Sequence, residues 1–337
     1  MGPVGLGRPV RRTGVGVKRT GAARGHVGHF HEVGFYGSDA EFAALAVPFI
    51  EEGVAAGEPV VVAYDDRKGD LVRSSLADPS AVEFIGGTSQ YATPARTIAA
   101  YQRLFESHVA NGAGQIRITG ELPRRGTGER FEGWDRYESA VNTVWQDFPV
   151  WGLCLYDTTT MPQAMLDVAE RAHPRIVSPS GQHRPSERYQ QVPAFTGLPV
   201  PPDPLEATAP MVELTDRPAA DVQDALERIG RRRLTDLTLA DLIFSVLEAA
   251  SNALLHGRPP VTVRIWTAPD RVVVTVHDTG RGPADPLAGL VPSSRGAPNA
   301  GLGLWMVHQL NIDTALLHTD DGFTVRLRAG KPPAGPA

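Results

Sequence analysis

Two polar residues in the last third of the chain have the spacing and the chemistry of a nucleotide site. Glu248 and Asn252 lie four residues apart in the apolar segment 244–257, whose periodicity predicts a helix. Residues four apart share one face of a helix, so the carboxylate and the carboxamide should point the same way. The carboxylate of Glu248 can accept a proton from an attacking hydroxyl or water. The amide oxygen of Asn252 suits Mg²⁺, which binds few protein oxygens and keeps phosphate and water ligands.

Two glycine-containing segments follow this helix. Asp278-Thr-Gly280-Arg-Gly282 comes first, and Gly301-Leu-Gly303 follows after a polar loop. An ionised Asp278 only accepts hydrogen bonds, so it would pair with the exocyclic amine of adenine and be repelled by the carbonyl of guanine. Gly280 and Gly282 let the backbone turn and approach the base, while Gly301 and Gly303 open a helix whose first amides can hold phosphates. The three boxes together predict an ATP site that favours adenine.

This order of boxes resembles the Bergerat-fold ATP-binding domain shared by gyrase, histidine kinases and MutL, and it is most similar to the anti-sigma-factor serine kinases of the RsbW type. The resemblance covers residues 205 to 330. By position it implies that Glu248 is the catalytic base, Asn252 the Mg²⁺ ligand and Asp278 the adenine reader, with the four glycines in the binding loops. Arg295, in the short loop before the last box, is available to reach a terminal phosphate.

The resemblance implies ATP and Mg²⁺ as cofactors and two protein partners. These are a sigma factor that is held inactive and a STAS-domain antagonist that is phosphorylated on serine or threonine. The alternative is a binding module in which ATP is a switching ligand and no phosphate is transferred. A third reading, an unorthodox histidine kinase, needs a phospho-accepting histidine on a dimerisation helix. His183 lies in a Pro- and Ser-rich loop and His31 in a strand-like segment, which argues against it.

Composition narrows the class of protein. A chain of 337 residues suggests two domains, and a net charge of −5 gives no reason to expect direct binding of nucleic acid. The single cysteine, Cys154, excludes an intramolecular disulfide. No segment approaches the 18 or so uninterrupted apolar residues of a membrane span, so we expect a cytoplasmic protein without a membrane partner. A homodimer stays open at this point.

The first half of the chain alternates predicted strands and helices. Apolar runs at 59–64, 81–85, 115–119 and 150–156 read as buried strands, and helical periodicity covers 39–57, 66–77, 94–111, 131–148 and 161–173. Such alternation predicts a mainly parallel sheet covered on both faces. Asp65, Asp66, Glu121 and Asp157 stand at the carboxyl ends of its strands, where ligands usually bind. No Gly-x-x-x-x-Gly-Lys-Ser/Thr motif occurs, so this half is not expected to hydrolyse ATP.

Three segments of this half carry a second resemblance. Residues 49–62, Leu153-Cys-Leu-Tyr-Asp157 and His173-Pro174 resemble the MEDS sensory domain, a RecA/KaiC-like fold that has lost its P-loop. This resemblance implies a receptor for a small-molecule or protein signal. A MEDS module joined to an RsbW-like ATPase is similar to the RsbA family of anti-sigma regulators.

The resulting domain plan has five parts. Residues 1–27, basic and rich in glycine, are predicted to be a disordered tail. A MEDS-like domain at 28–190 and a semi-rigid Pro-rich linker at 191–210 follow. The ATPase domain is expected at 211–330, as a two-layer α/β sandwich with helices on one face of a mostly antiparallel sheet, before a tail at 331–337.

Histidines and aromatic residues of the first half raise two further questions. His29 and His31 would lie on the same face of a strand. Together with His26 and His173, they are candidate metal ligands. Because no cysteine or tight acidic set joins them in the sequence, we interpret them as polar edge residues. Cys154, in a buried strand, is expected to be inert. The aromatic residues Trp134, Tyr137, Trp145 and Trp151 are expected in the core.

Overall fold

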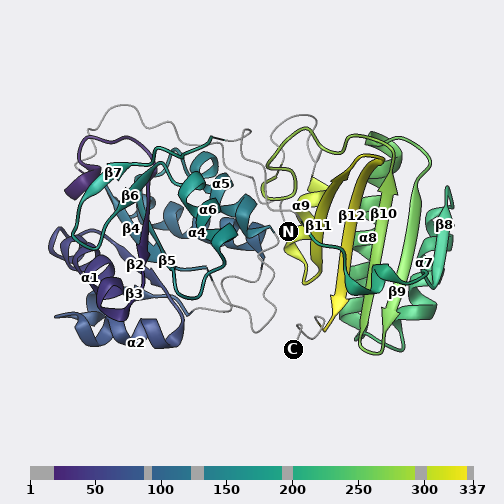
Figure 1. The fold of residues 1–337 in the computed structure, drawn as a ribbon, viewed down its shortest axis with the longest axis horizontal. Helices are drawn as coiled ribbons and strands as arrows, with labels where there is room; N and C mark the ends of the chain where they lie inside the picture. The colour runs from purple at the N-terminus through teal and green to yellow at the C-terminus, as the bar shows by residue number, and fades with distance from the viewer. Residues whose placement is uncertain (1–18, 87–92, 123–132, 192–199, 293–301, 332–337) are drawn as a thin grey trace.

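The computed structural model describes residues 19–86, 93–122, 133–191, 200–292 and 302–331 (Figure 1). The chain forms two layered units, each with its own sheet and its own apolar core. The first unit is built on a mainly parallel sheet and the second on an antiparallel sheet with helices. The predicted fold class is therefore confirmed.

The first sheet has seven strands in the order β3-β2-β4-β5-β1-β6-β7. Their bounds are β1 Phe30–Tyr36, β2 Val60–Ala63, β3 Glu83–Phe84, β4 Ile116–Gly120, β5 Val150–Asp157, β6 Arg175–Val177 and β7 His183–Pro185. All neighbours pair in parallel except β6 and β7, which are antiparallel. The sequence did not reveal this short edge pair, because three residues carry too little periodicity to mark a strand.

Helices cover both faces of this sheet. Alternate residues of β2 show why: Val60 and Val62 pack with α1 (Asp39–Ala55) and α2 (Asp66–Ser75). Val61 and Ala63 pack on the opposite face, with α4 (Pro94–Ala110), α5 (Trp134–Val144) and α6 (Gln163–Ala172). Successive strand residues point to opposite faces, so a strand buried on both sides reads as a continuous apolar run. The four aromatic residues expected in the core are buried there.

Residues 19–27 differ from the predicted tail. The side chain of Arg19 is buried, and its guanidinium donates to Gln115 Oε1 at 2.7 Å and to the carbonyl of Val150 at 2.8 Å. Burial lowers the pKa of Arg19 to about 10. A basic, glycine-rich segment resembles a solvated tail in the sequence, because the acceptors that fix Arg19 lie about a hundred residues away. The first 18 residues lie outside the described part of the chain.

The second sheet has five strands in the order β11-β12-β10-β9-β8, all antiparallel to their neighbours. Its elements are β8 Val212–Thr215, α7 Ala219–Gly230, α8 Asp236–His256, β9 Thr262–Ala268, β10 Arg271–Asp278, α9 Leu302–Gln309, β11 Asp313–Thr319 and β12 Gly322–Gly330. Val272, Val274 and Val276 of β10 point to the helices and pack with Leu242 and Val246 of α8. This sheet with helices on one face matches the predicted sandwich.

The other face of the second sheet is covered by part of the predicted linker. Asp203, 1% exposed, contacts Arg271 at 3.3 Å and Arg328 at 3.8 Å. The short 3-10 helix η3 (Pro204–Ala207) follows, and its Glu206 pairs with Arg326 at 3.0 Å. Residues 200–208 therefore belong to the second unit. The Pro-rich composition of this segment predicted a linker. Its packing on the sheet could not be predicted, because the arginines that pair with its carboxylates lie in strands far along the chain.

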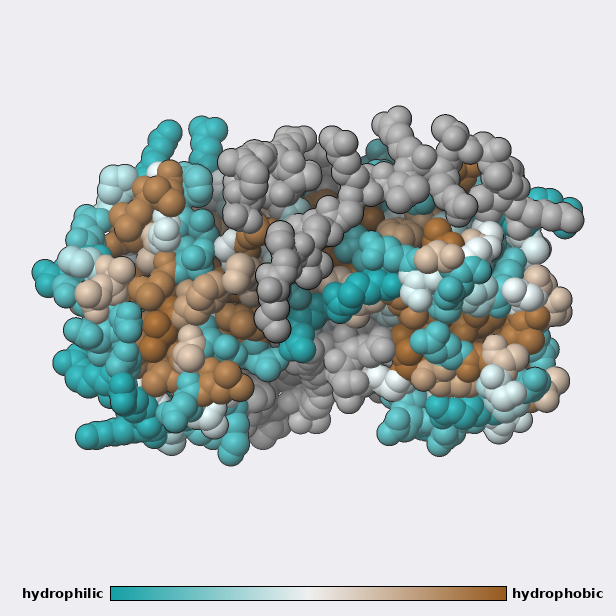
Figure 2. All heavy atoms as spheres, turned by 180° about the vertical axis from the view of Figure 1, so that it is seen from behind, coloured by the Kyte–Doolittle hydropathy of each residue, from teal (hydrophilic) through white to brown (hydrophobic). Residues whose placement is uncertain are grey.

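Helix α8 is long and apolar enough to cross a membrane, judged by length and composition alone. A core helix of a globular domain passes the same test. The buried face of α8, with Leu242, Val246 and Ala249, packs on the sheet. Leu254 and Leu255 at its end are exposed, and from behind, apolar residues gather over this unit (Figure 2).

We predict that Asp203→Ala destabilises the second unit by roughly 3 kcal/mol, because it leaves the buried guanidinium of Arg271 without its carboxylate and removes one of the two carboxylates that pair with Arg328. Urea unfolding followed by tryptophan fluorescence measures the change. Asp224→Ala, on the exposed face of α7, is the matched control and should stay within about 0.5 kcal/mol of the wild type. Equal stability of the two variants would show that the 200–208 segment does not hold the unit together.

Candidate ATP site

Glu248 and Asn252 lie one turn apart on α8, as their spacing predicts. Both are half-buried and flank the stripe of Ala249 and Ala253, which packs against the sheet. The helix is fixed at its start by Thr235, whose hydroxyl accepts from the amide of Thr238. Among the described residues the amide of Asn252 makes no side-chain hydrogen bond, so its oxygen is free to bind a cation.

The last glycine box meets the first box directly. Gly303 is the second residue of α9, and a Cβ added to it would overlap Glu248 Oε2. A larger residue at position 303 would push the carboxylate of Glu248 away from the start of α9. The first amides of a helix carry no backbone partner and favour anions. The structure therefore places a candidate proton acceptor beside a candidate phosphate-binding end.

Asp278 is the last residue of β10, and its side chain points towards the helical layer. Val272, Val274 and Val276 face the helical layer, and Asp278 continues the same alternation. It is 3% exposed, and its Oδ1 accepts from the amides of Gly280 at 2.7 Å and Arg258 at 3.0 Å. Oδ2 has no hydrogen-bond partner among the described residues. One carboxylate oxygen is thus fixed by the backbone, and the other remains available to a ligand.

Two glycines enclose the carboxylate of Asp278. A Cβ at Gly257 would overlap the carboxyl group, and one at Gly280 would lie 2.6 Å from Oδ1. Gly282 has a φ of 69°, and a side chain there would overlap the ring of Phe323. Sequence reasoning assigned no role to Gly257. The signal that could have found it is its place directly after the helix that carries Glu248 and Asn252.

The structure thus brings most of the predicted site residues together around α8. Glu248 meets Gly303, and Asp278 lies against Gly257, the residue that ends α8. Gly280 and Gly282 follow Asp278 in one tight turn. Arg295 and Gly301 lie outside the described residues, so their phosphate-binding roles stay predictions.

The segment between the Asp278 turn and α9 contacts the first unit. Arg136 of α5 donates to the carbonyls of Pro286 and Ala288, both at 2.9 Å. Leu290 is 2% exposed and belongs to the same apolar cluster as the residues of α4 and α5. Residues 286–290 are therefore held by the first unit, although in the sequence they lie between the Asp278 turn and α9, two parts of the candidate site.

A second contact joins α4 of the first unit to α9 of the second. Thr93 Oγ1 donates to the carbonyl of His308 at 2.9 Å, and Arg96 donates to Asn311 Oδ1 at 2.7 Å. His308 is buried, and burial together with the charge of Arg136 lowers its pKa to about 3. The imidazole is therefore neutral at physiological pH, and it places no second positive charge beside Arg136.

The strand-end carboxylates of the first unit are largely engaged by the protein itself. Asp65 accepts from the amide of Lys68 and caps α2, and Asp157 accepts from the amide of Thr159 at 2.9 Å. Glu121 is buried, pairs with Lys68 and accepts from Tyr36 Oη. Asp66 is exposed in the first turn of α2. This edge therefore resembles a packed polar end of the sheet more than an open acidic crevice.

We predict that Asp278→Asn shifts base selectivity from adenine towards guanine. The amides of Gly280 and Arg258 still need an acceptor, so the new NH₂ group should take the place of Oδ2 and donate to the guanine carbonyl. Competition binding with ATP and GTP measures the ratio of affinities. The exposed Asp320→Asn is the matched control. A wild type that binds both nucleotides equally would remove Asp278 from the base site.

Comparisons with protein families agree with this division of the chain. Residues 30–174 match the family model of the MEDS domain, a methanogen/methylotroph DcmR sensory domain. Residues 212–329 match the model of the histidine kinase-like ATPase domain. No curated protein matches the chain. The ATPase match implies ATP binding and so agrees with the site built on α8 and Asp278. The chain is therefore an ATP-binding, kinase-like regulatory protein that joins a MEDS sensory domain to a histidine kinase-like ATPase domain, the architecture of RsbA-like proteins.

Proposed function

We propose that the protein is a cytoplasmic anti-sigma factor and serine/threonine kinase. It sequesters a sigma factor and phosphorylates a STAS-domain antagonist, under control of its MEDS domain. The observation that supports phosphoryl transfer is the position of Glu248. It lies one turn from Asn252 and against the start of α9 at Gly303. A proton acceptor is thus adjacent to the end of a helix suited to phosphate.

Each residue of the site has one task in this mechanism. Asp278 Oδ2 accepts a hydrogen bond from the adenine amine while the backbone holds Oδ1. Asn252 would hold Mg²⁺ through its amide oxygen, and the ion, when bound, would offset the charge of the phosphates. Glu248 accepts the proton of the attacking serine or threonine hydroxyl. The amides at the start of α9 bind phosphate oxygens.

The histidine-kinase alternative finds little support among the described residues. His31 is buried, and His183 lies on the edge strand β7 with Nδ1 3.0 Å from Glu32. His108 lies on α4, partly buried beside Glu83 at 3.5 Å. Because α4 packs its apolar face into the core, it is not a free dimerisation helix. The binding-module alternative requires the same arrangement of nucleotide-binding residues. The Glu248→Gln experiment below distinguishes it from the kinase.

Partner binding is expected at the end of α8. Leu254 and Leu255 are 65% and 72% exposed, two and three residues after Asn252. Large exposed apolar side chains beside a ligand site are typical of protein contacts. We therefore propose this end of α8 as part of the sigma-binding surface, where nucleotide occupancy can affect the partner.

Signal from the MEDS domain has a direct route to the nucleotide site. Arg136 holds the carbonyls of Pro286 and Ala288, and Leu290 is inserted in the apolar core of the MEDS domain. A small-molecule or protein signal that displaces α5 would therefore move the loop beside the nucleotide. Such coupling is reciprocal, so nucleotide would also change the affinity for the signal.

We expect Glu248→Gln to leave nucleotide affinity nearly unchanged and to slow phosphoryl transfer by about 10²- to 10⁴-fold, the usual loss for a general base. The readout is labelling of a STAS-domain protein captured with the chain from native lysate. The exposed Asp224→Asn is the control and should transfer at the wild-type rate. If wild type and Glu248→Gln both fail to label every such protein, the binding-module alternative replaces the kinase.

A second prediction addresses the contact between the domains. The nucleotide affinity of the full chain should differ by at least about fivefold from that of the fragment 200–337, since allosteric couplings are commonly of this size or larger. Arg136→Ala should remove most of this difference, whereas the exposed Arg103→Ala on α4 should preserve it. Equal affinities of full chain and fragment would show that the contact transmits nothing to the site.

A further inference from the structure

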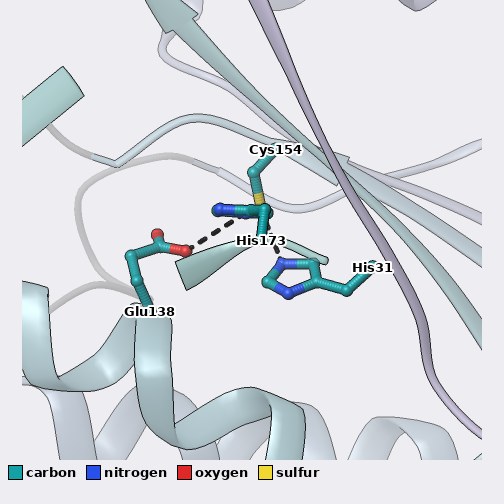
Figure 3. A group of neighbouring side chains, drawn as sticks. All are labelled: His31, Glu138, Cys154 and His173. Atoms are coloured by element: carbon teal, nitrogen blue, oxygen red, sulfur yellow. Dashed lines mark hydrogen bonds and ion pairs between the residues drawn. The ribbon is translucent and has the colours of Figure 1, made fainter. Parts of the chain in front are cut away.

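Four side chains of the MEDS domain that the proposed function does not use converge on one point (Figure 3). They are His31 on β1, Glu138 on α5, Cys154 on β5 and His173, which follows α6. One ligand atom from each lies within 4.8 Å of all the others. The expectation that no cysteine or acid joins these histidines is therefore wrong, and so is their interpretation as edge residues. The cysteine is 123 residues from His31 in the sequence.

The parallel pairing of β1 and β5 creates this proximity. Val33 lies opposite Cys154, so His31 and Cys154 stand two positions apart in register and point to the same face of the sheet. Gly152 lies opposite His31, and a Cβ there would lie 3.0 Å from Nε2 of His29, whose ring stacks on that of His31. The glycine thus makes room for the stacked ring of His29. Helices α5 and α6 cover this face and contribute the other two groups.

The hydrogen bonds around His31 fix its tautomer. The amide nitrogen of Asn142 donates to the carbonyl of Ala172 at 2.6 Å, which turns the amide oxygen towards His31 Nδ1 at 3.0 Å. Because that oxygen can only accept, Nδ1 carries the proton. Nε2 therefore presents a lone pair, and it lies 3.4 Å from Cys154 Sγ. Metal-binding histidines are oriented by the same kind of bond to the outer nitrogen.

His173 is fixed in the same way. Its Nδ1 lies 2.7 Å from the carbonyl of Ala169, an acceptor, so Nδ1 again carries the proton. Nε2 lies 3.4 Å from Glu138 Oε2, and neither atom has a hydrogen-bond partner. Both residues are almost completely buried. A lone pair and a carboxylate oxygen thus face each other in the interior, which is unfavourable unless a proton or a metal cation lies between them.

We propose that His31, Glu138, Cys154 and His173 form a tetrahedral zinc site. Two imidazoles, a thiolate and a carboxylate are all ligands that Zn²⁺ accepts. Bond lengths of about 2.0–2.3 Å to zinc place neighbouring ligand atoms roughly 3.3–3.7 Å apart. The pairs His31–Cys154 and His173–Glu138 already have this separation, each at 3.4 Å. Only a small contraction of the cluster is then needed.

Protons are the competing occupants of the cluster. Burial lowers the pKa of His31 to about 4 and that of His173 well below its usual value, so neither imidazole gains a second proton at neutral pH. Burial raises the pKa of Glu138 to about 7, and raises that of the Cys154 thiol. Without metal, the thiol would donate to His31 Nε2 and the carboxylic acid to His173 Nε2. Zinc displaces both protons, so its affinity should rise with pH.

A small cavity adjoins the cluster. A cavity of about 40 Å³ is lined by His31, Glu138 and Cys154, together with His29 and aromatic residues of α4 and α5. This space exceeds what one water molecule needs. The cavity can therefore hold water beside the ligands. The site is independent of the ATP site, so it stands even if the kinase proposal fails.

Metal content of the purified full-length chain tests the proposal first. After incubation with Zn²⁺ and exchange into metal-free buffer, we expect about one zinc per chain by mass spectrometry. Cys154→Ser and His173→Ala should each lower zinc affinity at least about tenfold in chelator competition. His108→Ala, which removes a histidine of the same domain outside the cluster, should have no effect. Zinc that is absent from the wild type, or that both variants retain in full, overturns the proposal.

Cobalt substitution gives a second readout, which reports the thiolate ligand directly. Tetrahedral Co²⁺ bound through Cys154 should show intense visible bands and a thiolate charge-transfer band in the near ultraviolet. The charge-transfer band should be lost in Cys154→Ser and retained in His108→Ala. Circular dichroism of the variants separates loss of a ligand from loss of the fold. A cobalt-loaded wild type without the thiolate band means that protons, not metal, fill the cluster.

Discussion

The close approach of α9 to Glu248 is the constraint on which the rest of the ATPase domain depends. Gly303 leaves the carboxylate in this position, because a side chain there would push the end of the Glu248 side chain aside. The close approach also needs α8 to be held on the sheet by Leu242 and Val246, so that the polar face of α8 looks towards α9. The same helix ends at Gly257, which lies against Asp278. One helix thus sets the distance between Glu248 and Asp278.

Helix α5 has a similar role in the MEDS domain. Arg136, near its start, holds the loop beside the nucleotide site, and Glu138 lies two residues later in the buried cluster. Asn142, one turn further, orients His31. If binding or loss of metal in the buried cluster moved α5, the movement would therefore reach the ATPase domain through Arg136. The cluster and the loop are joined by one rigid element, and no longer chain of contacts is required.

The sequence predicted what depends on local spacing and missed what depends on distant partners. Hydrophobic periodicity alone predicted that Glu248 and Asn252 share a helix face and that Asp278 ends a strand, and the structure shows both. The packing of Asp203 on Arg271 and Arg328 could not be predicted, because it joins a Pro-rich segment to two separate strands. The cluster of His31 and Cys154 was missed for the same reason: strand order and register bring them together. Neither quantity can be read from one sequence.

The most direct test of the central claim is a crystal structure of the full chain with Mg²⁺ and a non-hydrolysable ATP analogue. We predict that the adenine amine lies about 2.9 Å from Asp278 Oδ2. We also predict that Mg²⁺ is bound by the amide oxygen of Asn252, and that the terminal phosphate lies between Glu248 and the start of α9. A nucleotide that leaves Asp278 and Asn252 without contacts, or that binds elsewhere on the chain, would contradict the account.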